Sequence, residues 1–292
     1  MLRHPLAEVF GFPIGNSSKE ATRHRAKRLC PYNNKVPNCT KDKAKDPLGV
    51  CSVYESDNEV ITCPVRFRQN WLIADDAAAF FFPPDISWTS LTEVRLPDKQ
   101  GRSAGNIDVV LVAYNDRGRV IDFGALEVQA VYISGNIRNA FEYYMQNPKD
   151  RHDMTWEGSY YPRPDYLSSS RKRLAPQLIY KGGILNKWGK KSAVVVDKNF
   201  FSSLPTLPGT SSDNADIAWL IYDLSLDPDK NRYDLTHYQT VYTAFTPALE
   251  TITKAEAGPV EGFVEHLQQK LDEKLENGYP PYAPTLTDLI EE

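Results

Sequence analysis

Residues 107–133 read IDVVLVAYNDRGRVIDFGALEVQAVYI, and this stretch decides the fold. Both ends are rich in β-branched and other apolar residues, whereas Asn115-Asp116-Arg117-Gly118 in the middle has the composition of a tight turn. The stretch therefore predicts two strands, 107–114 and 120–133, that pair antiparallel. Pairing around the turn places Asp108 opposite roughly residues 125–127, and so beside Glu127.

The acidic residues of these strands are candidates for a catalytic site. Glu127 and Gln129 are two residues apart, so their side chains share one face of the strand. The strands are too apolar to be solvated on both faces, which places the acids near the edge of a core, where an unpaired charge is costly. Asp108 and Glu127 are the hard oxygen ligands that Mg²⁺ takes, and bound Mg²⁺ activates water for phosphodiester hydrolysis. The alternative is that the acids simply face water.

The remaining chain predicts a mixed α/β fold. Apolar periodicity predicts helices at 71–82, 87–96, 137–145, 174–188 and 263–275, and β-rich runs predict strands at 193–197, 217–224 and 238–245. Glu93 falls within the predicted helix 87–96, one element before the hairpin, where it would hold a second metal or a metal-bound water. Strands and helices in this order predict a mixed central sheet flanked by helices.

All four cysteines lie within one short window, at Cys30, Cys39, Cys51 and Cys63. The N-terminus lacks the pattern of a signal peptide, so we expect a soluble, cytoplasmic protein in which disulfides are disfavoured. Four clustered thiols then indicate a structural metal, zinc or iron, and the alternative is buried free thiols. Residues 31–63 show little periodicity and predict loops that the metal would organise, within a module spanning residues 1–70. Residues 71–292 form the second predicted domain.

Positive charge is concentrated in the first 45 residues, which hold ten Lys and Arg and three acidic residues, although the whole chain has a net charge of −4. Ser17-Ser18-Lys19-Glu20 fits a capping box and predicts a short basic helix that ends before Cys30-Pro31. A second basic cluster lies at 171–173. Such clusters are typical of nucleic-acid contacts, although each residue alone is more often a solvated charge. The candidates are Arg23, Arg25, Lys27, Arg28, Arg171, Lys172 and Arg173.

The acidic pattern resembles the core of the PD-(D/E)XK nuclease superfamily, in which a helical Glu and a strand Asp precede a Glu-x-Lys. Here Glu93, Asp108 and Glu127-Val128-Gln129 would correspond, with Gln129 in place of the lysine. Glutamine cannot supply a positive charge, but its amide can hydrogen-bond the attacking water. The four-cysteine module and the Glu-x-Gln variant together resemble the NotI family of type II restriction endonucleases. The residues that carry this resemblance are Cys30-Pro31, Cys39, Gly49–Val53, Cys63-Pro64, Arg66, Gly124–Gln129, Gly135, Lys172-Arg173, Gln177 and Tyr180-Lys181.

This resemblance implies a Mg²⁺-dependent endonuclease that cuts double-stranded DNA at a GC-rich palindrome. It also implies an iron on the four thiols, a homodimer, and a cognate DNA methyltransferase in the same restriction-modification system. The size of the chain is close to family members with a six-base site, which implies CGGCCG as the target. Two alternatives remain: a repair nuclease or junction resolvase of the same superfamily, and a non-catalytic, metal-stabilised DNA-binding protein.

Overall fold

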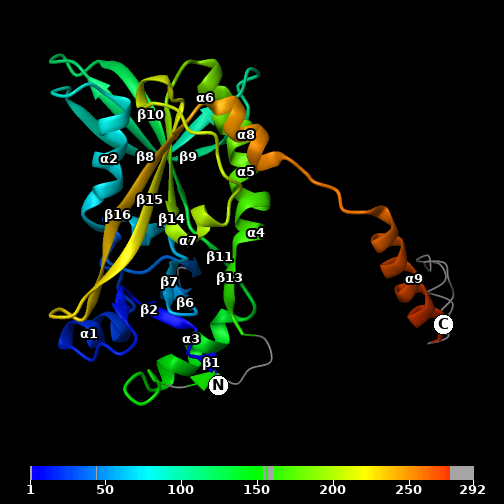
Figure 1. Ribbon diagram of the computed structural model, residues 1–292. Helices are drawn as coiled ribbons and strands as arrows, with labels where there is room; N and C mark the ends of the chain where they lie inside the picture. The colour runs from blue at the N-terminus through cyan, green and yellow to red at the C-terminus, as the bar shows by residue number, and fades with distance from the viewer. Residues whose placement is uncertain (1, 44, 154, 157–160, 277–292) are drawn as a thin grey trace, which may run out of the picture. The chain divides into compact units, whose positions relative to one another are not determined.

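The computed structural model describes residues 2–43, 45–153, 155–156 and 161–276 (Figure 1). Residues up to Thr253 form one compact unit, and the residues from Lys254 onward form a second. The first unit contains the central sheet and every residue that the sequence predicts to be functional. In the second unit, α9 (Val260–Glu276) is the predicted amphipathic helix.

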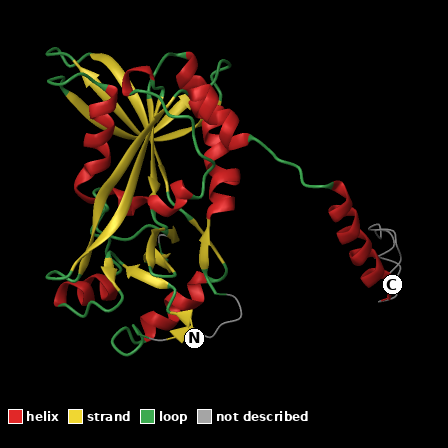
Figure 2. Cartoon of the chain, in the orientation of Figure 1, coloured by secondary structure: helices red, strands yellow, loops and turns green. Residues whose placement is uncertain are grey.

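A six-stranded mixed sheet forms the centre of the first unit (Figure 2). The contacts β10–β14 and β14–β15 are parallel, and the other neighbours are antiparallel. This confirms the predicted mixed sheet and its hairpin. The strands, in spatial order, are β16 (Arg232–Thr243), β15 (Ile217–Asp227), β14 (Ser192–Asp197), β10 (Val120–Gln129), β9 (Ser103–Tyr114) and β8 (Trp88–Pro97).

Both faces of the sheet are covered by helices, as the near-continuous apolar sequence of β14 requires. Val194 and Val196 belong to one buried cluster, whereas Ala193 and Val195 belong to another, because successive side chains of a strand point to opposite faces. The second cluster includes α2 (Leu72–Phe81), which lies on one side of the sheet (Figure 1). The helices on the other side are α5 (Ala175–Gln177), α6 (Gly183–Lys187) and α8 (Phe245–Thr253). The sheet is therefore the shared wall of two cores.

One long, irregular helical stretch covers the face opposite α2. It contains two π-helical segments and carries Pro176, which has no N–H for the usual helical hydrogen bond. π-Helical turns are rare and often lie at functional sites. The helix predicted at 174–188 is confirmed and begins earlier. Its segments are α4 (Tyr166–Ser169), η2 (Ser170–Leu174), α5 (Ala175–Gln177), η3 (Leu178–Gly182) and α6 (Gly183–Lys187).

The helix predicted at 87–96 is wrong, because these residues form β8, paired antiparallel with β9. The spacing of Leu91 and Val94 imitates a helical face, but their exposures follow a strand: Leu91 is exposed and Val94 is partly buried. A period of two runs through the segment, with alternate residues more buried. The prediction of one continuous strand 120–133 also needs correction, since β10 ends at Gln129 and β11 (Tyr132–Ser134) pairs elsewhere.

The N-terminal segment is more regular than the sequence predicts. Residues 31–63 were expected to be loops, yet β6 (Val50–Glu55) and β7 (Asn58–Ile61) lie within them and pair with β2 (Leu6–Val9) and β3 (Phe12–Pro13) in a four-stranded sheet. The predicted basic helix is α1 (Lys19–Lys27), and its N-cap is Ser18, one residue after the Ser17 of the predicted capping box. Buried residues of β2, β6 and β7 join the cluster that contains β14 and β15, so this segment shares a core with the central sheet.

Shorter elements complete the first unit. Among the described residues, no helix is both long and apolar enough to cross a membrane. The helix predicted at 137–145 is confirmed as α3. The short elements are β1 (Leu2–Arg3), β4 (Asp42–Lys43), β5 (Asp46–Pro47), η1 (Pro64–Trp71), α3 (Ile137–Gln146), β12 (Thr155–Trp156), β13 (Arg163–Asp165), α7 (Lys198–Ser202), η4 (Ser212–Asn214) and α8 (Phe245–Thr253).

A fully buried ion pair links the N-terminal sheet to η1 and β16. The side chains of Glu8 and Arg66 have no solvent exposure, and Arg66 Nε lies 3.0 Å from Glu8 Oε2. Ser52 Oγ donates a hydrogen bond to Glu8 at 2.9 Å, and Arg66 Nη2 donates to the carbonyl of Tyr233 at 2.8 Å. These bonds offset the cost of removing both charges from water.

Replacing one member of this pair will destabilise the protein strongly. Glu8→Gln leaves the Arg66 charge buried and uncompensated, so we expect the free energy of unfolding to fall by about 3–5 kcal/mol, measured by chemical denaturation. Asp98→Asn is the matched control, because the Arg102–Asp98 pair lies at the surface, and it should change stability by less than about 1 kcal/mol. Equal effects of the two substitutions would contradict this assignment.

Candidate functional site

The hairpin brings the predicted acidic residues together. Val109 of β9 pairs with Leu126 of β10, so Asp108 and Glu127 occupy the next position of the same ladder, as the turn predicted. Asp108 Oδ2 accepts a hydrogen bond from the backbone N–H of Val128 at 2.8 Å, which fixes that carboxylate against β10. Glu127 is 7% exposed and Gln129 is 3% exposed. The two carboxylates and the amide therefore form one largely buried polar group on two interior strands of the sheet.

Two oxygens of this group have no hydrogen-bond partner in the described structure. They are Glu127 Oε1 and Gln129 Oε1, and both are buried. The amide nitrogen of Gln129 donates to the carbonyl of Ala130 at 3.4 Å. Because buried polar atoms in folded proteins normally have partners, two neighbouring free oxygens indicate a place where a ligand completes the site.

A lysine from the long helix completes the polar group. Lys181 Nζ lies 2.6 Å from Glu127 Oε2 and donates to the carbonyl of Asn106 at 2.9 Å. Lys181 lies in the π-helical segment η3 and is 6% exposed. The sequence assigned it no functional role. A signal was present, however, since Lys181 occupies a core position of an apolar stripe whose other buried members are Leu174, Leu178 and Leu185.

The electrostatics of the site centre on Glu127. Burial raises the pKa of its carboxyl to about 7; the Lys181 ammonium opposes this effect, and the neighbouring Asp108 carboxylate adds to it. A buried carboxyl with a specific charged partner in a cleft is typical of functional sites. The arrangement concentrates two acids and one base in a small volume.

Glu93 lies at the same level of the sheet but not on a helix. Its neighbours Thr92 and Val94 pair with Val109 and Ile107 of β9. Glu93 on β8 therefore lies opposite Asp108 on β9. Its side chain is exposed, and its backbone has a φ of 57°, in the left-handed region that non-glycine residues rarely adopt. The structure thus places Glu93 near the row of acids without a bond to them among the described contacts. Backbone strain of this kind is often found beside functional sites.

A cleft of about 700 Å³ runs from the acidic site to the N-terminal segment. Asp108 and Gln129 lie at one end, and Arg173 and Gln177 of the long helix line one wall. The opposite wall includes Lys41 and residues of the loop around 62–65. The acidic site is therefore open to a ligand through a cleft whose charged lining residues are Lys41, Arg138 and Arg173 together with Asp42 and Asp108.

The seven basic candidates fall into different environments. Of the cluster 171–173, all of which are exposed, Arg173 lines the cleft, and its guanidinium lies 4.2 Å from the centre of the Tyr132 ring. Arg25 is only 6% exposed, and its guanidinium donates to the carbonyls of Asn16 and Pro13, so its charge is used inside the protein. Arg28 pairs with Asp46. Arg23 and Lys27 are exposed on α1, away from the residues that line the cleft.

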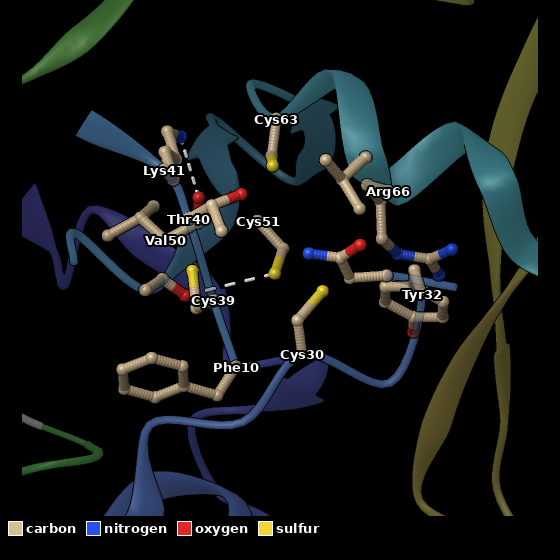
Figure 3. Close-up of a pocket in the computed structure, with 13 residues that line it drawn as sticks. Phe10, Cys30, Tyr32, Cys39, Thr40, Lys41, Val50, Cys51, Cys63 and Arg66 are labelled. Carbon is tan, nitrogen blue, oxygen red and sulfur yellow. Dashed lines mark hydrogen bonds between the residues drawn. The ribbon is translucent and has the colours of Figure 1, made fainter. Parts of the chain in front are cut away.

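The four cysteines converge on one small cavity of about 10 Å³ (Figure 3). They come from separate parts of the N-terminal segment: Cys30 follows α1, Cys39 lies in a loop, Cys51 is on β6, and Cys63 precedes η1. All four are free thiols. The predicted cluster thus exists in space as well as in sequence.

The cavity has the size of one small ion or water molecule. As they stand, the His, Cys, Asp and Glu side chains of the described residues form no group of three or more that could hold a metal ion. Cys51 Sγ donates instead to the carbonyl of Gly49 at 3.8 Å. Burial raises the pKa of the Cys30 thiol to about 11 and raises that of Cys51 well above its ordinary value. Metal binding would require the sulfurs to lose their protons and move inward.

Lys41 connects this cavity to the cleft. It lines both of them, and its Nζ donates to the carbonyls of Val50 at 2.6 Å and Thr62 at 3.0 Å. These bonds tie the loop before β4 to β6 and to the end of β7. The thiol cluster therefore underlies one wall of the cleft that leads to Asp108.

The mixed sheet, the acidic hairpin and the adjoining cleft are the features expected of a restriction endonuclease. The family model of restriction endonuclease NotI matches residues 8–235, well over half of the chain, and the chain belongs to this family. The matched range includes the four cysteines, the acidic site and Lys181. No curated protein matches the chain. Family membership makes the protein a site-specific nuclease that acts on double-stranded DNA.

Proposed function

We propose that this protein is a type II restriction endonuclease that hydrolyses phosphodiester bonds in double-stranded DNA with Mg²⁺ held at Asp108 and Glu127. The observation that carries the proposal is the pairing of these two carboxylates on the β9–β10 hairpin, beside two buried oxygens without partners. The site opens into a cleft whose lining includes Lys41, Arg138 and Arg173, which suits a polyanionic substrate. The target we propose is a GC-rich palindrome, with CGGCCG as the first sequence to test.

The residues present fit a hard divalent cation. Asp108, Glu127 and Gln129 offer oxygens, and Mg²⁺ is commonly held by one or two carboxylates together with water and substrate phosphate. When bound, Mg²⁺ would supply a water of lowered pKa and neutralise charge that develops on the phosphate. The set contains two carboxylates, which agrees with the lack of a three-residue His, Cys, Asp and Glu group among the described side chains.

The chain's own residues divide the remaining work. Asp108, fixed by the Val128 N–H, presents its carboxylate to the cleft. Gln129 presents its amide to the attacking water. The water oxygen would form the new bond to phosphorus as the bond from phosphorus to the leaving deoxyribose oxygen breaks, and the leaving oxygen would take up a proton in place of the one that the water loses to solvent. Glu93 assists from β8 by holding a second metal or a metal-bound water. Arg173 grips a phosphate of the DNA from the wall of the cleft.

The quaternary state follows from the substrate. A palindrome cut in both strands presents two equivalent scissile bonds related by a two-fold axis, so we propose a homodimer that brings one active site to each strand. The host genome would contain the same sequence. A cognate DNA methyltransferase that modifies this sequence is therefore the expected partner in a restriction-modification system.

The four thiols are proposed to hold one structural metal, iron or zinc. The support is their convergence on a cavity of single-ion size, since four sulfur ligands suit either metal. Cys51 lies on β6 and Cys63 directly precedes η1, so a shared ion would tie β6 to the start of η1, whose first residues line the cleft. Its role would be to fix that wall for DNA recognition.

Removal of either carboxylate should abolish discrete cleavage. We expect Asp108→Asn and Glu127→Gln to lower the cleavage rate of a supercoiled plasmid in Mg²⁺ by on the order of 10²–10³-fold or more, because the charge that holds the cation is lost. Asp116→Asn, in the exposed turn of the same hairpin, is the control and should cleave normally. Discrete bands from the two site variants would refute the assignment.

The wild-type digestion in the same assay distinguishes the proposed function from its alternatives. Discrete fragments that map to one sequence support a restriction endonuclease. Nicking that depends on DNA structure would instead indicate a resolvase or repair nuclease, and a mobility shift without cleavage would indicate a non-catalytic DNA-binding protein. Mapping the fragment ends also tests CGGCCG as the target.

Arg173→Ala should weaken DNA binding without changing which sequence is cut. Loss of one phosphate contact should reduce the slope of log affinity against log salt by about 1, measured by fluorescence anisotropy at several salt concentrations with Ca²⁺ in place of Mg²⁺. Arg171→Ala is the matched control, because Arg171 is exposed on the same segment but does not line the cleft. An equal loss in both variants would place the contact outside the cleft.

Loss of one thiol should remove the structural metal. We expect Cys51→Ser to contain less than about one tenth of the iron or zinc that the wild-type chain holds in a ratio of about 1:1, measured by inductively coupled plasma mass spectrometry. Its melting temperature should also fall, because the binding energy of such a metal contributes to folding. Unchanged metal content would show that the thiols are simply buried.

A further inference from the structure

We propose that Lys181 supplies, from the long helix, the positive charge that position 129 lacks, and so acts as the cation of the active site. This inference rests on the proposed function of Asp108 and Glu127. Gln129 carries no charge, and Lys181 is the basic side chain that the described structure places in contact with Glu127. The same helix carries Arg173 and Gln177 along the cleft. The cation therefore reaches the site from an element that also faces the DNA.

Lys181 has close contacts along both its ammonium group and its aliphatic stem. Its ammonium is held by Glu127 Oε2 at 2.6 Å and by the carbonyl of Asn106 at 2.9 Å. Its aliphatic stem lies against Gly105, where a side-chain carbon would come within 3.4 Å of Lys181 Cδ. Gly105 has a φ of +122°, which L-residues with side chains rarely adopt. The aliphatic stem of Lys181 therefore lies within van der Waals distance of the start of β9, and a side chain at position 105 would still fit beside it.

Stability alone does not account for a lysine at this position. The other buried members of its helical stripe are leucines, and an apolar side chain at 181 would avoid the desolvation of an ammonium. Replacing a buried ion pair by apolar residues is often neutral or stabilising, so such a pair is weak evidence for a role in stability. A role for the charge in the reaction explains better why residue 181 is a lysine. Charge that develops in a reaction is stabilised best by fixed charges in a site shielded from water.

The contact with Lys181 leaves one oxygen of Glu127 without a partner. Lys181 bonds to Glu127 Oε2 alone, and Glu127 Oε1 remains without a partner beside Gln129 Oε1. The lysine therefore fixes the carboxylate by one oxygen and leaves the other for a divalent cation. Lys181 is consequently a positioning residue for Glu127 and, in addition, a fixed positive charge beside the reacting phosphate.

The test measures cleavage, metal binding and folding in the full-length protein. Lys181→Met keeps the length of the side chain and removes its charge. We expect cleavage of a supercoiled plasmid in Mg²⁺ to slow by on the order of 10²-fold or more. The melting temperature should fall, because Glu127 is left buried without its partner, but the variant should remain folded at the assay temperature, which circular dichroism checks. Ca²⁺ binding, measured by calorimetry without DNA, should stay within about 3-fold of wild type or become tighter, because a like charge has been removed.

A second variant separates charge from structural support. Adding Gln129→Lys to Lys181→Met places a cation on the same face of β10 as Glu127, and it should restore cleavage by at least about 10-fold over the single variant. A role limited to packing would not respond to this relocation of charge. Lys190→Met is the matched control, because Lys190 pairs with Asp122 at the other end of β10, and it should cleave as the wild type does.

Three outcomes would overturn the proposal: Lys181→Met cleaving within about 3-fold of the wild type, Ca²⁺ binding weakened more than about 10-fold in that variant, or no rescue by Gln129→Lys. Failure of the proposed function has a different signature. In that case the wild-type protein itself would give no discrete cleavage in Mg²⁺, and Asp108→Asn would behave like the wild type.

Discussion

The register of β9 against β10 is the constraint on which the rest of the site depends. Pairing Val109 with Leu126 brings Asp108 level with Glu127, and the bond from the Val128 N–H to Asp108 holds the two strands at that level. A slip of one residue would move every side chain of the strand to the opposite face. The apolar residues that alternate with the acids prevent such a slip, because it would expose the core. The register that core packing requires therefore also fixes the position of the carboxylates.

The N-terminal segment belongs to the same physical system. Its strands bury residues in the cluster that includes β14 and β15, and the Glu8–Arg66 pair connects it to β16. The thiol cluster lies in this segment and underlies one wall of the cleft through Lys41. A change at the thiols would therefore alter the shape of the substrate cleft rather than a remote module.

Sequence patterns within one segment predicted the elements that do not depend on distant parts of the chain. The hairpin, its turn, the buried strand β14 and helix α3 follow from periodicity and turn residues within each segment. Strand β8 was missed because the three-residue spacing of Leu91 and Val94 imitates a helix, and only pairing with β9 settles the alternatives. Strands β6 and β7 were missed because β2, far away in sequence, completes their sheet. Lys181 was seen as part of a helical stripe, but its partner Glu127 is 54 residues away, and no local pattern reveals such a contact.

A physical argument explains why the positive charge beside Glu127 comes from Lys181 and not from position 129. Gln129 is 3% exposed and has an unpartnered oxygen, so position 129 provides a hydrogen-bond acceptor and no charge. Two buried carboxylates without a nearby positive charge would repel each other and favour protonation. Lys181 supplies such a charge from a different element, and it bonds to the oxygen of Glu127 other than the unpartnered one. The polar contacts of the site therefore come from both the hairpin and the long helix, and the proposed catalysis would depend on how these two elements pack.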